Sequence, residues 1–243
     1  MSTIFDVAVM GGGPGGYVAA LRAAQNGLSV VCIDDGVNAR GEPSPGGTCL
    51  NVGCIPSKSL LQSSELYAQI QHEASIHGVN VEGVTFNAAA MIQRKDAIVG
   101  RLTMGIGLLF KKNNVKHLCG LATLERAQDE IWQLRVNDQQ ILARNVVIAT
   151  GSQPRQMSGI VIDNQQILDN RGALALTEVQ PRLGVIGAGV IGLELGSVWN
   201  RVGSDVTLLE MAPTFLPALE ARLSNEVRKA MIASGMKIQL AVE

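Results

Sequence analysis

The sequence predicts an α/β fold made of two dinucleotide-binding folds, each with a parallel sheet, and the chain is expected to end within the second. Two observations carry this prediction. A strand, a glycine-rich turn, a helix and a strand ending in an acid open the chain, and the same pattern returns 176 residues later. The composition agrees, because 47% hydrophobic residues and 27 glycines suit α/β layers joined by tight turns.

The first copy begins with an apolar strand over residues 4–10. The glycine-rich turn 11–16 follows, and a helix is predicted from there to about Asn26. A second apolar strand, residues 29–33, ends at Asp34. Strand, glycine turn and helix in this order are typical of a Rossmann-like βαβ unit.

The second copy repeats each element. Residues 183–186 form the strand, 187–192 the glycine turn, and a helix runs to about Val202. The next strand, 205–209, ends at Glu210. One glycine fingerprint is weak support for a nucleotide site, whereas two copies that both carry a terminal acid are strong support.

Each glycine of the pattern has a physical task. The first makes the tight turn, the second lets the backbone approach a pyrophosphate, and the third lets helix pack closely on strand. The phosphates then lie at a helix N-terminus, where free N–H groups favour negative charge. These glycines are Gly11, Gly13 and Gly16 in the first copy and Gly187, Gly189 and Gly192 in the second.

The terminal acids Asp34 and Glu210 are placed to accept hydrogen bonds from a ribose diol. The Glu210 carboxylate would also repel a 2′-phosphate, and Met211 to Pro213 supply no cation to receive one. The second fold is therefore predicted to bind NAD in preference to NADP.

Cys49 and Cys54 lie five residues apart between glycines, and we interpret them as a redox-active disulfide. A regular helix would hold their Cα atoms about 8.7 Å apart, beyond the roughly 4.4–6.8 Å that a disulfide accepts. The pair therefore requires irregular backbone, which Gly53 can supply. A structural zinc site and a structural disulfide are the less favoured alternatives, and no metal site is predicted. Cys32 and Cys119 lie in apolar runs and are predicted to be core residues.

Between the two copies, helices are predicted over residues 57–75 and 87–112, and strands over 115–119, 131–136 and 140–149. The last strand ends in a turn at Thr150 and Gly151, where backbone could approach a cofactor. The predicted domains are 1–152, a linker 153–182, and 183–243. The apolar face of the second helix is predicted to be core: Met91, Ile92, Ile98, Val99, Leu102, Ile106 and Leu109.

Charge and hydropathy exclude several partners. The net charge of −1 offers no field for nucleic acid or anionic lipid. No apolar run approaches the roughly 20 residues that a membrane span needs, and no basic export signal opens the chain. A cytoplasmic location is expected.

The chain resembles the class I flavoprotein disulfide reductases in its two fingerprints, its segment 46–58 and its turn at 149–151. The sequence of residues 49–58 is most similar to the dihydrolipoamide dehydrogenase branch of that family. The resemblance implies electron flow from dihydrolipoamide through the Cys49–Cys54 disulfide and FAD to NAD⁺. Cys49 would meet the substrate and Cys54 the flavin, while Lys58 would lie near the flavin and pair with Glu194. The implied FAD contacts are Gly11, Gly13, Gly16, Asp34, Gly47, Thr48, Lys58, Gly120, Thr150 and Gly151.

The resemblance also implies partners: lipoyl domains of 2-oxoacid dehydrogenase complexes or of the glycine-cleavage system, and a second subunit in a homodimer. Members of the family are nearly twice this length, so the rest of the NAD fold, the dimerisation domain and its histidine base are expected to be missing. None of His72, His77 and His117 is assigned as that base. Mercuric or glutathione reductase-like activity, and a non-catalytic nucleotide-binding fragment, remain as alternatives.

Overall fold

The computed structural model describes residues 3–128 and 130–242, and the chain divides into two compact units. One contains residues 1–56 and 97–156, and the other contains residues 57–96 and 157–243. The division at residue 156 lies four residues after the predicted boundary at 152, and residues 57–96 group with the second unit. Within the second unit, Ser57 and Lys58 both bind Glu194.

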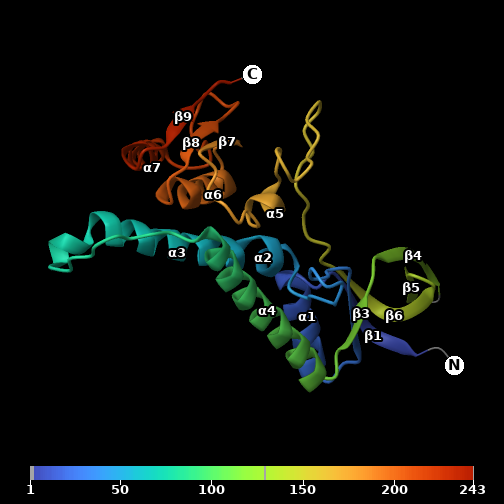
Figure 1. Ribbon diagram of the computed structural model, residues 1–243. Coiled ribbons are helices and arrows are strands. Elements are labelled where there is room, and N and C mark those ends of the chain that lie inside the picture. The colour runs from blue at the N-terminus through green and yellow to red at the C-terminus, as the bar shows by residue number, and fades with distance from the viewer. Residues whose placement is uncertain (1–2, 129, 243) are drawn as a thin grey trace. The chain divides into compact units, whose positions relative to one another are not determined.

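The first unit is built on a six-stranded sheet of order β3-β2-β1-β6-β5-β4. Figure 1 labels β1, β3, β4, β5 and β6 of this sheet. The parallel strands are β1 (Ile4–Met10), β2 (Val30–Asp34), β3 (Lys116–Cys119) and β6 (Gln139–Ile148). β5 (Ile131–Val136) pairs antiparallel with β6 and with β4 (Ala122–Gln128). The expected parallel sheet is mixed, because β5 runs antiparallel to both of its neighbours.

Both faces of this sheet are covered by apolar side chains. One face packs against α1 (Pro14–Gln25) and the later turns of α4 (Ala88–Lys112) through Leu21, Ile106 and Phe110. The other face gathers Val31, Ile33 and Leu134. Burial on both faces explains why β2 is apolar at nearly every position.

The second unit holds a three-stranded parallel sheet of order β7-β8-β9. Its strands are β7 (Arg182–Ile186), β8 (Asp205–Leu209) and β9 (Lys237–Gln239), and its helices include α5 (Asn170–Ala173), α6 (Val190–Arg201) and α7 (Ala221–Ala233). Trp199 and Val206 are almost fully buried in this unit. The helical part comprises most of α3 (Cys54–His72), the short 3-10 helix η1 (Ala74–His77) and the first turns of α4.

The internal duplication extends to strand register and hydrogen bonding. Val7 pairs with Val30 in the first copy, and Leu183 pairs with Val206, each 176 residues later, in the second. The bond from the Gly11 amide to the Ile33 carbonyl oxygen has its counterpart between Gly187 and Leu209, and both measure 2.7 Å. Helices α1 and α6 begin and end at equivalent residues. Two Rossmann-like units are therefore present, as predicted.

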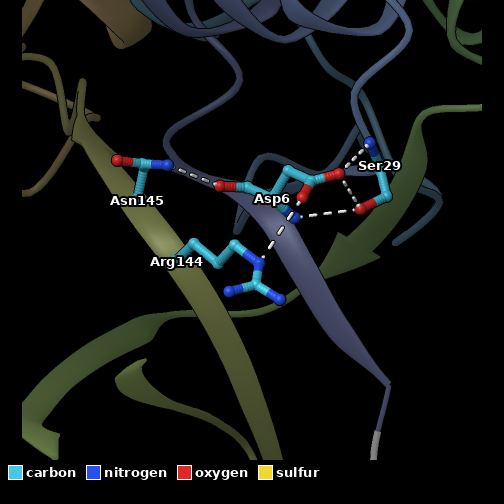
Figure 2. A network of polar contacts seen from close by, with 4 residues as sticks. All are labelled: Asp6, Ser29, Arg144 and Asn145. Atoms are coloured by element: carbon cyan, nitrogen blue, oxygen red, sulfur yellow. Dashed lines mark hydrogen bonds and ion pairs between the residues drawn. The ribbon is translucent and has the colours of Figure 1, made fainter. Parts of the chain in front are cut away.

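A polar network closes the amino end of β1 and β2 (Figure 2). The Asp6 amide donates to Ser29 Oγ at 2.9 Å, while the Ser29 amide and hydroxyl both donate to Asp6 Oδ2, at 2.9 and 2.7 Å. Arg144 and Asn145 of β6 add an ion pair at 3.7 Å and a hydrogen bond to the Asp6 carbonyl oxygen at 3.0 Å. The network joins the starts of β1 and β2 to β6.

Two core predictions are wrong. Cys32 is buried, but Cys119 is exposed, because it is the last residue of the edge strand β3. On α4, Met91, Ile92 and Ile106 are buried as predicted, whereas Leu102 and Leu109 are more than two-fifths exposed. Their exposed surface lines a pocket described below.

Among the described residues, no helix is long and apolar enough to cross a membrane.

Candidate dinucleotide and disulfide site

The first glycine turn is possible only without side chains. Gly11 has a φ of +108°, and a Cβ there would stand 2.0 Å from the Ala149 carbonyl oxygen. A Cβ on Gly16 would stand 1.8 Å from the carbonyl oxygen of Gly11. The turn therefore brings β1, α1 and the end of β6 into direct backbone contact, and it leads to the N-terminus of α1 at Gly13.

Asp34 lies at the carboxyl end of β2 and faces this turn. Its Oδ1 accepts a 2.8 Å hydrogen bond from the Gly12 amide. Its Oδ2 is buried and has no hydrogen-bond partner within residues 3–128 and 130–242. A buried carboxylate oxygen without a donor costs free energy, so this atom is suited to a donor from a ligand. A ribose hydroxyl beside a pyrophosphate at Gly13 meets that requirement.

The segment that bears Cys49 and Cys54 consists of two helices separated by one glycine. Cys49 lies in α2 (Gly47–Val52), and Cys54 is the first residue of α3. Gly53 between them has φ −138° and ψ −115°, and a Cβ there would stand 2.8 Å from the Thr48 carbonyl oxygen. The irregular backbone expected between the two cysteines is present at the residue expected to supply it.

Glycines also join this segment to the dinucleotide turn. Gly47 has a φ of +59°, and a Cβ there would stand 2.5 Å from the Gly13 Cα. The Thr48 hydroxyl donates to the Ser152 carbonyl oxygen at 3.3 Å, which ties α2 to the turn after β6 that includes Thr150 and Gly151. Four segments that were predicted to contact FAD thus lie together in the first unit: the turn after β1, the end of β2, α2 and the turn after β6.

Gly120 reaches the same region from β3. Its amide donates to the Asp34 carbonyl oxygen at 2.9 Å. Its φ is +152°, and a Cβ there would stand 2.8 Å from the Asn137 side chain.

The sequence analysis gave Asn51 no role, yet its side-chain amide nitrogen donates to the carbonyl oxygens of Ser44 and Gly47 at 3.0 and 3.1 Å. Its signal in the sequence is its place midway between the two cysteines.

An open apolar pocket of about 520 Å³ adjoins the cysteine segment within the first unit. Leu50 and Ile55, the residues that follow Cys49 and Cys54, line it together with residues of α1 and α4. This size falls within the roughly 300–1,000 Å³ of small-ligand sites. The remaining lining residues are Tyr17, Arg101, Leu102, Gly105, Ile106 and Leu109. Sequence periodicity missed it because a pocket wall and a core face have the same apolar spacing.

In the second unit, Lys58 and Glu194 form the expected ion pair between α3 and α6. Ser57 donates its hydroxyl to the other carboxylate oxygen at 3.0 Å. The Lys58 side chain is 60% exposed and that of Glu194 only 22%. The carboxylate thus fixes the start of α3 against α6 and leaves the ammonium group accessible.

The second glycine turn repeats the first with one difference. A Cβ on Gly192 would stand 2.1 Å from the Gly187 carbonyl oxygen, as at the first turn. Glu210, the counterpart of Asp34, accepts 2.9 Å hydrogen bonds on both oxygens, from the amides of Ala188 and Ala212. Each oxygen keeps further acceptor capacity for a ribose. Among the described residues, no group of three or more His, Cys, Asp or Glu side chains is placed to hold a metal ion.

Residues 5–243 match the family model described as pyridine nucleotide-disulphide oxidoreductase, and the chain belongs to that family. Its members use FAD and NAD. The resemblance drawn from the two fingerprints and the cysteine segment is therefore confirmed. The donor set described above also fits both cofactors, since each fold offers a glycine turn, a helix N-terminus and an acid at the end of its second strand.

The chain is similar to the dihydrolipoyl dehydrogenase of Cupriavidus necator, with 50% identity over all of this chain and 52% of the relative. The mitochondrial dihydrolipoyl dehydrogenase of Pisum sativum is 44% identical over 97% of this chain and 46% of its own length. Among solved structures, the HOCl-induced flavoprotein disulfide reductase RclA of Escherichia coli matches 98% of this chain and 49% of that chain, with a TM-score of 0.80 and 27% identity. The chain spans about half the length of the relatives it matches.

Proposed function

We propose that the chain provides the FAD fold, the redox cysteines and the first part of the NAD fold of an enzyme that oxidises dihydrolipoamide with NAD⁺. The observation that carries this proposal is the pair of cysteines on either side of Gly53, one inside α2 and the other opening α3. It is supported by the similarity to dihydrolipoyl dehydrogenases over the whole of this chain.

In the proposed reaction, one thiolate of dihydrolipoamide attacks the Cys49 sulfur and breaks the Cys49–Cys54 bond, which leaves Cys54 as a thiolate. The second substrate thiolate attacks the first substrate sulfur and releases Cys49, so that lipoamide forms and both cysteines are reduced. FAD, when bound, accepts the two electrons and delivers them as hydride to NAD⁺. The irregular backbone at Gly53 suits this exchange, because two cysteines five residues apart in a regular helix would be too far apart to form the bond.

The apolar pocket supports the substrate class. Its lining is apolar apart from Arg101 and Tyr17, and Leu50 and Ile55 place it next to the cysteine segment. An acyl chain ending in a dithiolane ring presents apolar surface of the kind such a wall buries. Lipoyl domains of 2-oxoacid dehydrogenase complexes or of the glycine-cleavage system are the proposed carriers of that chain, with a homodimer as the working assembly in the cytoplasm.

The remaining site residues have proposed roles as well. Lys58 places its ammonium group near the flavin and is held by Glu194, while Glu210 selects NAD over NADP by repelling a 2′-phosphate. In the first fold, Asp34 binds the ribose of FAD, and the glycines of the turn, Gly47, Thr48, Gly120, Thr150 and Gly151 surround the remainder.

A thiol count after reduction tests this function. The oxidised chain, loaded with FAD and freed of excess, is treated anaerobically with one equivalent of dihydrolipoamide, and protein thiols are counted by mass-tagged alkylation. The proposal expects two new thiols, at Cys49 and Cys54, together with one lipoamide. The matched control is the Cys49→Ser, Cys54→Ser variant, which should gain none and form no lipoamide.

Other outcomes would identify the alternatives. Retained flavin without any gain of thiols would indicate a nucleotide-binding fragment without redox cysteines. Reduction of the pair by glutathione but not by dihydrolipoamide would indicate a glutathione reductase-like enzyme, and a Hg²⁺-dependent oxidation of NADPH would indicate a mercuric reductase-like one. Either result would contradict the proposed substrate while leaving the family unchanged.

A further inference from the structure

Cys119 is an exposed thiol beside Asp34. The two residues are register partners in the parallel pairing of β2 and β3, so their side chains leave the same face of the sheet. The backbone on each side of this thiol is fixed. The Gly120 amide binds the Asp34 carbonyl oxygen at 2.9 Å, and the Asn137 side chain donates to the Cys119 carbonyl oxygen at 3.4 Å.

Asp34 provides an independent sign of a ligand at this place. Only 8% of the residue is exposed, and its Oδ2 finds no donor in the part of the chain that the structure describes. A donor from a ligand, such as a ribose hydroxyl, would satisfy this atom. A ligand bound there would lie just beyond the carboxyl ends of the parallel strands. Cys119 is at that end of the sheet too, because it is the last residue of β3, the neighbour of β2.

We propose that Cys119 is a modification site for soft electrophiles, such as α,β-unsaturated carbonyl compounds, that is open only while the adenosine half of the FAD site is empty. Its adduct occupies the space beside Asp34 and prevents FAD from binding. This inference rests on the proposed binding of FAD at Asp34. It makes the thiol a point at which the newly made chain, before it has taken up flavin, can be inactivated.

The chemistry needs no further reactant. The thiolate of Cys119 adds to one alkene carbon, a C–S bond forms as the π bond breaks, and the neighbouring carbon takes a proton from water. Cys32 does not compete, because it is fully buried and because burial, reinforced by the charge of Asp34, raises the pKa of its thiol to about 12. Cys119 is thus the accessible thiol of this sheet face.

The experiment follows alkylation by N-ethylmaleimide in a Cys49→Ser, Cys54→Ser background, with the site identified by mass spectrometry of peptides. Labelling at Cys119 is timed without ligand, with FAD, and with FMN, which lacks adenosine. At a free FAD concentration of about ten times the Kd, about a tenth of the chains are empty, so labelling should slow about tenfold. FMN should leave the rate unchanged. Prelabelled chain should fail to bind FAD, measured as flavin absorbance retained after gel filtration, whereas Cys119→Ser should bind FAD before and after maleimide treatment.

A second thiol controls for general changes on binding. In the Cys119→Ser, Gln25→Cys variant, the new thiol lies exposed at the last residue of α1, which leads to the amino end of β2, whereas Asp34 lies at the carboxyl end of that strand. FAD should not slow the labelling of this thiol. Equal labelling of Cys119 with and without bound FAD, or normal FAD binding by the adduct, would overturn this inference and leave the proposed function intact. Failure of the unlabelled chain to bind FAD at all would overturn both.

Discussion

Lys58 and Glu194 join helix α3 to helix α6 through an ion pair in which the carboxylate is largely shielded and the ammonium group is open to solvent. Ser57 holds the second carboxylate oxygen, so Glu194 is bound on both sides by neighbouring residues of one helix. Ion pairs with a solvated partner add little to stability. The arrangement instead restricts where the Lys58 side chain can go.

A double-mutant cycle with Lys58→Met and Glu194→Gln should give a coupling of about 0.5 kcal/mol in the free energy of unfolding. The value is small because Lys58 is well solvated. Urea unfolding of the four proteins measures it. Since salt screens exposed charges, the coupling should vanish in about 1 M NaCl. A coupling that is large and insensitive to salt would contradict the exposed geometry described here.

Gly47→Ala should be far more damaging than Gly27→Ala, although both residues have positive φ. At Gly27 nothing lies within 4 Å of a new Cβ, so only the backbone strain of about 1 kcal/mol is expected. At Gly47 the new Cβ would stand 2.5 Å from the Gly13 Cα, and the two segments must separate. We expect a loss of more than about 2 kcal/mol in unfolding free energy and weaker FAD retention. Similar losses in both variants would show that the contact is unimportant.

The sequence predicted the duplicated units closely because periodicity, glycine and a terminal acid act together over short distances. Strands β1, β5 and β8 begin and end at the predicted residues. It did not predict β4, in which the polar residues Thr123, Glu125 and Arg126 are exposed, nor α7, whose sequence carries no glycine or acid signature of its own. These elements depend on partners brought together by the rest of the fold.

The site was predicted unevenly for a physical reason. The role of residues that must be glycine, such as Gly11 and Gly16, can be predicted from the sequence, because any side chain there would collide with backbone. Leu102 and Cys119 do not, because an apolar residue at the correct spacing looks the same in a core, at a pocket or at the end of an edge strand. Only the structure shows which of these surroundings each residue has.

The Asp6 network of Figure 2 should make stability fall in acid. Hydrogen bonds from the side chain and backbone of Ser29, with a smaller effect of Arg144, hold the pKa of Asp6 below its ordinary value of 3.8. The stabilisation is therefore complete above about pH 4 and is lost as the pH falls through the lowered pKa. The Ser29→Ala variant should be less stable than the parent above about pH 4, and this difference should become smaller below pH 4. Thermal unfolding of both proteins across pH 3 to 6 measures it.

Two further variants test the assignment to Asp6. In an Asp6→Asn background, Ser29→Ala should produce a deficit that no longer changes with pH, because the titrating group is gone. A deficit that still narrows in acid would assign the effect to another carboxylate. Asp163, whose pKa is also lowered, by the amides of Gln165, Ile167 and Gln166, is present in every variant and cancels in the comparison.

Glu210→Gln should weaken the discrimination between NADH and NADPH. The substitution keeps the side-chain length but removes the charge that repels a 2′-phosphate. We expect the ratio of the two Kd values, measured by the fluorescence of the bound reduced nucleotides, to fall about tenfold, which corresponds to about 1.4 kcal/mol. Glu220→Gln is the matched control, since Glu220 is an exposed residue of the same unit. An equal change in that variant would indicate a general effect of net charge.

The second glycines of the two turns, Gly13 and Gly189, have nearly the same backbone angles, φ −73° and ψ −177° against φ −76° and ψ 179°. A pyrophosphate would find the same cradle at either one. What differs is the neighbour, since Gly47 lies against Gly13 while no described residue approaches the Cβ position of Gly189 within 4 Å. We therefore expect the choice between a flavin and a nicotinamide cofactor to depend on residues outside the fingerprint, and exchanging the two glycine turns should leave each fold with the cofactor proposed for it.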